Sequence, residues 1–142
     1  MAFNVLVVDD SAVMRAMIIR ILKMTGIPLG DILEAEDGAE ALEYLDENWV
    51  DLALVDINMP VMNGEELIDR VRDNPELRDL AIIVVSTESS ETRVQKVQRQ
   101  GARFVHKPFT PEILREEVLE VTGVSHESRP GSGIEASGEL DF

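Results

Sequence analysis

The chain has 142 residues and a formal net charge of −15 at pH 7, with 28 acidic side chains against 13 basic ones. This length is typical of one domain, and a composition that is 44% hydrophobic and 29% charged is typical of a globular protein with a substantial core. The negative charge argues against direct binding to nucleic acid or to an anionic membrane surface. The absence of cysteine excludes disulfides, thiolate metal sites and a cysteine nucleophile.

Targeting signals are not evident in the sequence. The chain contains no apolar run of 18 residues, and its start lacks a charged segment followed by an apolar one. We therefore expect neither a membrane span nor a secretory signal, and we expect a cytoplasmic protein.

Short apolar runs alternate with amphipathic segments along the chain. The runs are rich in aliphatic and β-branched residues, as expected for buried strands, and lie at 3–8, 31–35, 52–55, 81–85 and 103–105. Apolar residues at helical spacing predict helices over 11–25, 37–49, 65–72, 90–100 and 110–121. This alternation indicates an α/β domain with parallel crossovers and helices on both faces of one sheet.

Residues 125–142 differ in composition from the rest of the chain. They are rich in Ser, Gly, Glu and Pro and carry a charge of −3, which leaves −12 for the preceding residues. We therefore predict a folded domain over 1–124 and a flexible acidic tail or linker start over 125–142. Ile134, Leu140 and Phe142 are candidates for docking on a partner or on the domain, although a free chain end is the simpler interpretation.

Polar and charged residues follow four of the predicted strands. Asp9 and Asp10 end the first strand, Asp56 the third, Ser86 and Thr87 the fourth, and Lys107 the fifth. Parallel strands bring their carboxyl ends to one edge of the sheet, so we expect these side chains to converge there. Three carboxylates repel one another unless a cation joins them, and an oxygen cluster without His or Cys suits Mg²⁺.

Phosphoryl chemistry fits the same set of groups. Lys107 supplies an ammonium that can hold a phosphate oxygen, and Ser86 supplies a hydroxyl donor. Asp56 ends the middle strand, with partners on both sides, and is the predicted nucleophile that attacks phosphorus and becomes an acyl phosphate.

Each of these residues also has a purely structural interpretation. An Asp at a strand end is often a turn residue, Asp10-Ser11 can simply cap the first helix, and Ser86 can cap the fourth. Lys107-Pro108 can be an ordinary turn. The joint occurrence of complementary groups at four strand ends favours a functional site over four unrelated turns.

These motifs occur in the order found in a known family. They are Val7-Val8-Asp9-Asp10-Ser11, Asp56-Ile57-Asn58-Met59-Pro60 with Asn63-Gly64, Ser86, and Lys107-Pro108-Phe109. Residues 1–124 resemble the receiver domains of two-component response regulators, and within that family the stand-alone chemotaxis regulators. The resemblance implies a flavodoxin-like fold whose five parallel strands have the order 2-1-3-4-5.

The resemblance also implies a phosphoacceptor and a metal site. Asp56 matches the residue that accepts a phosphoryl group from a sensor histidine kinase. The family holds Mg²⁺ through residues that match Asp10, Asp56 and the backbone carbonyl of Asn58, and the equivalent of Asp9 acts through water. Mg²⁺ is thus the one cofactor that we expect.

The resemblance implies a conformational switch as well. Lys107 matches the lysine of the family and Ser86 its switch hydroxyl, while Phe104 occupies the position of the aromatic residue that moves inward. Phe104 stands where relatives often have Tyr, so it lacks a hydroxyl for a partner to bond. Asn58 and Glu88 match positions that tune dephosphorylation in the family. The alternative interpretation is that they are ordinary polar loop residues on a solvated rim.

The output partner is left open. One hypothesis is a stand-alone module that binds a chemotaxis or motor protein through the face of the fourth helix, fifth strand and last helix, as a monomer or a phosphorylation-dependent dimer. That face has mixed charges, as an ordinary solvated face would, at Glu88, Glu91, Arg93, Lys96, Arg99, Gln100 and Arg103. The alternative is a receiver domain excised from a longer regulator with a DNA-binding or cyclic-nucleotide output domain. That output domain could bind DNA, which this acidic domain is not expected to do.

Two further classes of protein share part of the pattern. Phosphatases of the haloacid dehalogenase type also form an aspartyl phosphate, but they need a second Asp two residues after the nucleophile, where this chain has Asn58. A flavodoxin-like cofactor binder would leave the acidic trio unexplained. Since a receiver consumes its own phosphorylation, we expect a signalling protein and not an enzyme.

Overall fold

The computed structural model describes residues 2–123, in which five strands alternate with five helices. The strands are β1 (Phe3–Val8), β2 (Leu29–Ala35), β3 (Leu52–Val55), β4 (Ala81–Ser86) and β5 (Arg103–His106). The helices are α1 (Ala12–Met24), α2 (Gly38–Glu47), α3 (Gly64–Asp73), α4 (Glu91–Arg99) and α5 (Pro111–Val121). The predicted tail, with Ile134, Leu140 and Phe142, lies outside the described residues.

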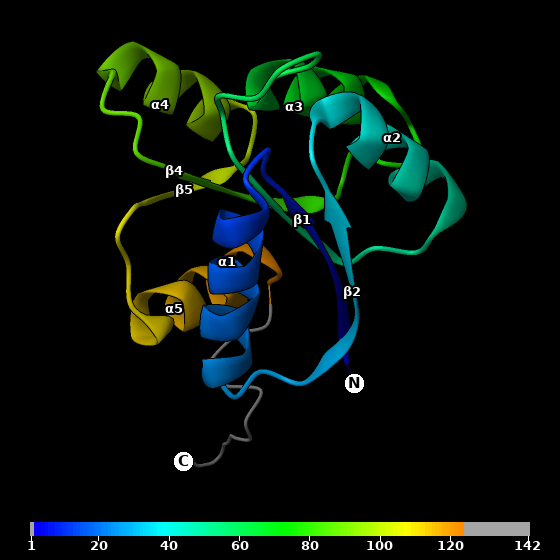
Figure 1. Ribbon diagram of the computed structural model, residues 1–142. Coiled ribbons are helices and arrows are strands. Elements are labelled where there is room, and N and C mark those ends of the chain that lie inside the picture. The colour runs from blue at the N-terminus through cyan, green and yellow to red at the C-terminus, as the bar shows by residue number, and fades with distance from the viewer. Residues whose placement is uncertain (1, 124–142) are drawn as a thin grey trace.

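The strands form one parallel sheet in the order β2-β1-β3-β4-β5. In Figure 1, α1 and α5 lie on one side of this sheet, and α2, α3 and α4 lie on the other. The predicted fold class and strand order are therefore confirmed. Strand order reverses between β1 and β3, which is where ligands bind in open parallel sheets. No helix within residues 2–123 has the length and apolar character needed to cross a bilayer.

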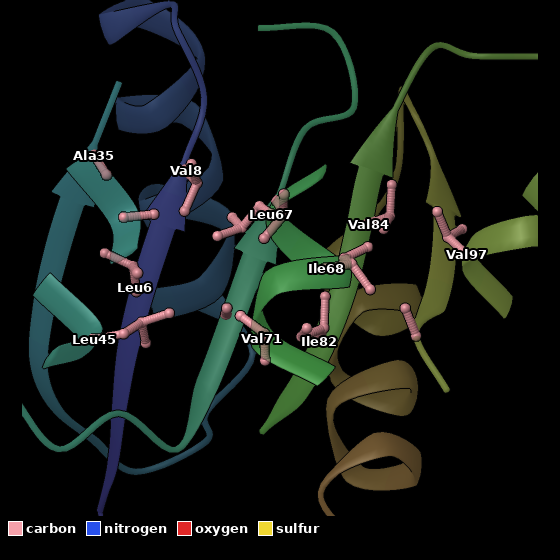
Figure 2. Packing of buried hydrophobic residues seen from close by; sticks show 14 of the residues in the cluster. Leu6, Val8, Ala35, Leu45, Leu67, Ile68, Val71, Ile82, Val84 and Val97 are labelled. Atoms are coloured by element: carbon pink, nitrogen blue, oxygen red, sulfur yellow. The ribbon is translucent and has the colours of Figure 1, made fainter. Parts of the chain in front are cut away.

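The same strands bury both faces of the sheet through alternate side chains. In β1, Leu6 and Val8 pack toward α2, α3 and α4, whereas Val5 and Val7 pack toward α1 and α5. Figure 2 shows the first of these layers, in which strand residues meet Leu45, Leu67, Ile68, Val71 and Val97 of the helices. Burial on both sides explains why the central strands read as unbroken aliphatic runs. It also gives the loops at their carboxyl ends a rigid base.

A side-chain cap precedes each of the five described helices. The capping residues are Ser11, Asp37, Asn63, Ser90 and Thr110. Each accepts a hydrogen bond from a backbone N–H of the first turn that would otherwise lack a partner. Because Ser90 caps α4, the interpretation of Ser86 as that cap is wrong, and Ser86 is instead the last residue of β4.

Strand β2 begins two residues earlier than the sequence predicts. Phe3 pairs with Leu29, and the register shifts before Val5 pairs with Ile32. The Asn4 side chain lies at this irregularity and accepts a hydrogen bond from the backbone N–H of Asp31, at 2.9 Å. The early start of β2 therefore depends on a contact between strands, which the local pattern around Pro28 does not reveal.

Candidate functional site

Asp9, Asp10 and Asp56 meet at the carboxyl ends of β1 and β3. Each has a carboxylate oxygen within 4.8 Å of those of the other two. The sheet register produces this cluster, because Val8 pairs with Val55 and the backbone N–H of Asp56 donates to the carbonyl of Val8. The three predicted carboxylates are therefore brought together as expected.

Asp9 is buried, with 1% of its surface exposed, and both of its carboxylate oxygens are bonded. One accepts from the backbone N–H of Ser11 at 2.9 Å, and the other lies 3.2 Å from Nζ of Lys107. A second cation, Arg15, donates to the Asp9 carbonyl at 2.6 Å and also pairs with Glu34. Asp9 thus anchors the site to α1, β2 and the loop after β5.

Lys107 follows β5 and reaches toward β1 across the two strands between them. Its backbone N–H donates to the carbonyl of Ser86 at 3.0 Å, which places it beside the end of β4. The peptide bond between Lys107 and Pro108 is cis. The ammonium is largely buried and pairs with Asp9, so the predicted cation lies within the acidic cluster.

Asp56 is half-buried in the same cluster. Burial raises the pKa of this carboxyl, and the nearby Asp9 carboxylate raises it further. The Lys107 ammonium, the backbone N–H of Ile57 and the Ser86 hydroxyl lower the pKa but do not cancel the rise. Asp56 therefore carries its charge at a free-energy cost that a bound cation would relieve.

The loop between β3 and α3 is held tightly against Asp56. The backbone N–H of Gly64 donates to the carbonyl of Ile57 at 2.8 Å, and a Cβ on Gly64 would collide with the carbonyl oxygen of Asp56. Asn63 and Glu66 form a reciprocal capping box at the start of α3. Val61, in the middle of the loop, has a positive φ of 66°, which is unusual for a β-branched residue. These constraints fix the backbone on which Asn58 sits.

Ser86 and Glu88 form the opposite side of the site. Ser86 is buried, and its hydroxyl accepts from the backbone N–H of Glu88 at 3.1 Å. The backbone N–H of Ser90 lowers the pKa of the Glu88 carboxyl, and the Arg93 guanidinium lowers it further. Asn58 is exposed at the rim and is linked to Glu88 through Arg93, which bonds both side chains.

Arg93 differs from a residue on a solvated face. Besides Asn58 and Glu88, it contacts the carboxylate of Glu65 through two nitrogens, at 2.8 and 3.2 Å. Sequence reasoning found neither this role of Arg93 nor Glu65, because the pairing joins residues 28 positions apart and belongs to no local motif. By contrast, Glu91, Lys96, Arg99 and Arg103 are exposed, as a mixed-charge surface requires.

Phe104 lies in β5 opposite Val84 of β4, and His106 lies opposite Ser86. Phe104 is half-buried and packs at the edge of the core layer that α2, α3 and α4 cover. Its ring lies 6.2 Å from that of His106, at an angle of 53°. The predicted aromatic is therefore close to the predicted hydroxyl along the strands, although it is a neighbour of the acidic cluster and not part of it.

The donor set of the cluster fits a hard divalent cation. Its carboxylates come from Asp9, Asp10 and Asp56, and the only ammonium paired with them in the described chain is that of Lys107. The backbone carbonyl of Asn58 belongs to the loop that leaves this cluster. Oxygen ligands without imidazole or thiolate favour Mg²⁺ over softer metals.

This fold and site define a class of protein, and comparison with known families agrees. The chain belongs to the response regulator receiver domain family, whose model matches residues 5–119. More specifically, it is a receiver domain of the CheY type, the class that acts in two-component signalling.

Three relatives illustrate the similarity. The chain is 43% identical over 124 residues to a chemotaxis protein CheY homolog of Campylobacter jejuni, which covers 84% of this chain and 92% of the relative. It is 41% identical over 126 residues to chemotaxis protein CheY1 of Helicobacter pylori, covering 86% and 98%. The solved structure of chemotaxis protein CheY4 of Vibrio cholerae superposes with a TM-score of 0.74 at 34% identity, covering 85% of this chain and 99% of CheY4.

Proposed function

We propose that this protein is a phosphoacceptor response regulator in which Asp56 receives a phosphoryl group from a sensor histidine kinase. The observation that carries the proposal is the convergence of three carboxylates with the Lys107 ammonium at one edge of the sheet. If each of these residues only formed a turn at the end of its own strand, there would be no reason for the four charged groups to lie together. The CheY relatives support the same role in a chemotaxis pathway, which implies a cytoplasmic location.

The transfer is a substitution at phosphorus. A carboxylate oxygen of Asp56 forms a bond to phosphorus as the bond from phosphorus to the histidine nitrogen breaks, and the imidazole leaves with that electron pair. Asp10, Asp56 and the Asn58 carbonyl would hold Mg²⁺, with Asp9 acting through water. The ion supplies neutralisation of the charge that develops on the phosphoryl oxygens. Lys107 binds a phosphoryl oxygen, which replaces its pairing with Asp9.

The new phosphoryl group then changes the face of α4, β5 and α5. Its oxygens offer the Ser86 hydroxyl, which already lies close enough to Asp56 to lower the pKa of that carboxyl, a stronger acceptor, so Ser86 moves toward the phosphoryl group and Phe104 moves into the space beside it. The exposed residues of this face bind a protein output partner when the switch has occurred. The protein binds neither nucleic acid nor membrane directly, because its surface is strongly acidic.

The phosphorylated state ends by hydrolysis, so the protein acts as a timed signal and not as an enzyme with external turnover. Water attacks phosphorus from the side opposite the Asp56 oxygen, where Asn58 and Glu88 form the rim. Asn at the first of these positions argues against a dedicated phosphatase, because an amide cannot donate a proton as a carboxylic acid does.

Labelling from a small acyl phosphate donor in the presence of Mg²⁺ tests the proposal. We expect the wild type to take up one base-labile phosphoryl group and Asp56→Asn to take up none. Asp73→Asn, an equal change of charge at an exposed position at the end of α3, serves as the matched control and should label normally. Equal labelling of the wild type and Asp56→Asn would refute Asp56 as the acceptor.

A further inference from the structure

Arg93 joins three separate segments near the candidate site. It lies in the first turn of α4, and its guanidinium contacts Glu65 in the first turn of α3. The same group donates to the Asn58 side chain at 3.2 Å and to the Glu88 carboxylate at 2.7 Å. Its contacts therefore span α3, the loop after β3 and the loop after β4.

The geometry of these contacts favours a fixed arrangement over a transient surface pair. Glu65 accepts from two nitrogens of Arg93, and a planar guanidinium held at two points has little freedom to rotate. The partners are also shielded, since the side chains of Glu65 and Glu88 are 15% and 17% exposed. The other carboxylate oxygen of Glu88 accepts from the backbone N–H of Ser90 at 3.1 Å. Both oxygens of Glu88 are thus occupied.

The two loop residues that Arg93 bonds belong to the loop after β3, which begins at Asp56, and to the loop after β4. Asn58 lies two residues after Asp56, and Glu88 lies two residues after Ser86, at the ends of neighbouring strands. A single guanidinium that bonds both side chains joins the two loops across the rim. The Asn58 side chain also hydrogen-bonds the Glu88 carboxyl, which lowers the pKa of that carboxyl, so Arg93 reinforces a direct contact between the two loops. We expect the loss of Arg93 to leave that contact as a weaker link and to loosen both side chains.

We propose that Arg93 is a positioning residue that ties the two rims of the site together and thereby prolongs the lifetime of the phosphoryl group on Asp56. This inference rests on the proposed phosphoacceptor function. In hydrolysis a water oxygen bonds to phosphorus, the bond from phosphorus to the Asp56 oxygen breaks, and the water proton passes to the released phosphate or to solvent. The tie restricts the approach of that water.

The decay of labelled protein after removal of the donor measures this effect. We expect Arg93→Ala to shorten the half-life of the label roughly three- to tenfold, because the rim opens. Arg93→Lys keeps the charge but loses the planar set of guanidinium donors. The half-life of the label on this variant should therefore lie between those of the wild type and Arg93→Ala. Arg20→Ala removes an equal charge from an exposed position on α1 and should leave the half-life unchanged.

Salt dependence separates positioning by ion pairs from a loss of folding. Added salt weakens these partly exposed pairs, so decay should accelerate with ionic strength in the wild type and respond less in Arg93→Ala. Glu65→Gln neutralises the anchor on α3 without touching the rim, and it should shorten the half-life by a smaller factor. If Arg93→Ala unfolds, Arg93→Lys and Glu65→Gln carry the same comparison.

The outcomes distinguish this inference from the proposed function. An unlabelled wild type overturns the phosphoacceptor function and this inference with it. If the wild type is labelled but its label decays as fast as, or faster than, the label on the folded Arg93 and Glu65 variants, the role of Arg93 is overturned and the phosphoacceptor function stands. A shorter half-life in Arg93→Ala with the same salt response as the wild type also overturns it, because the effect would then not depend on the ion pairs.

Discussion

Asp56 carries a charge in a position that disfavours it. Burial and the neighbouring Asp9 raise the pKa of its carboxyl, and the single ammonium of Lys107 does not offset them. A residue selected only for stability would be neutral here. The arrangement is useful if the unfavourable charge is what attracts a cation and then a phosphoryl group, so stability and function oppose each other at this residue.

Asp56→Asn should therefore stabilise the protein in the absence of divalent cations. Between the ordinary pKa of Asp and the raised pKa of Asp56, the folded protein binds a proton that the unfolded chain has released. Stability consequently falls as pH rises through that interval, and the substitution removes this loss. We expect a gain on the order of 1 kcal/mol at pH 7, allowing for solvent screening, measured by denaturant unfolding with a chelator present. A lower midpoint for Asp56→Asn under these conditions would contradict the assignment of strain to this carboxylate.

Gly64→Ala should be harmful for a steric reason. A Cβ at this position overlaps the carbonyl of Asp56 and approaches the backbone of Ile57, neither of which can move without shifting Asp56 itself. We expect a loss of roughly 1–3 kcal/mol in the free energy of unfolding and slower labelling of Asp56. Glu66→Ala, which removes half of the neighbouring capping box, should reduce stability by about 1 kcal/mol with less effect on labelling. Equal labelling rates for the two variants would count against the close approach of Gly64 to Asp56.

At the scale of elements, β4 and β5 connect the acidic cluster to the proposed output face. Ser86 ends β4 opposite His106, and the backbone N–H of Lys107 bonds to the Ser86 carbonyl. Phe104 lies in β5, two residues before His106, and packs at the edge of the core. We therefore expect a displacement of Ser86 toward a phosphoryl group on Asp56 to pass from the end of β4 to the neighbouring β5, without a rearrangement of the sheet.

A phosphoryl analogue such as beryllofluoride with Mg²⁺ should report this movement. We expect changes in amide chemical shifts from Ser86 through Phe109, with the side chain of Phe104 among the most affected. Ser86→Ala removes the hydroxyl, so it should reduce the shifts of β5 while leaving those around Asp56. Shifts confined to the loops that bear Asp10 and Asp56 would show that β5 does not respond.

What could be predicted from the sequence was whatever depends on local pattern. The bare aliphatic runs of β1 and β3 and the groups at their ends predicted the sheet and the meeting of Asp9 with Asp56. The start of β2 was missed because Leu29 joins the strand through its pairing with Phe3. The contacts of Arg93 were missed because the sequence of a polar helix does not show which distant segments pack beside it, so its arginine was interpreted as a solvated residue.

At the scale of the whole molecule, the distribution of charge matters more than its total. The net charge of −15 includes the cluster of Asp9, Asp10 and Asp56. The fold places these three carboxylates together at the edge of a sheet that is held rigid by helices packed on both of its faces. A flexible chain could relax this repulsion by separating the carboxylates. The packed core prevents that relaxation, and therefore the folded state should bind a divalent cation that the unfolded chain does not bind.

Mg²⁺ should consequently stabilise the folded protein by mass action. At a concentration ten times its dissociation constant, a ligand that binds only the folded state adds about 1.4 kcal/mol, which corresponds to roughly 3–8 °C in the midpoint of thermal unfolding for a domain of this size. Asp10→Asn removes an exposed carboxylate from the cluster and should lose most of this shift. A monovalent salt at equal ionic strength is the control, since general screening of the acidic surface would also raise the midpoint. An equal rise with the monovalent salt, or an undiminished rise in Asp10→Asn, would mean that the three carboxylates do not form a specific cation site, because either effect would then arise from the overall charge and not from their placement.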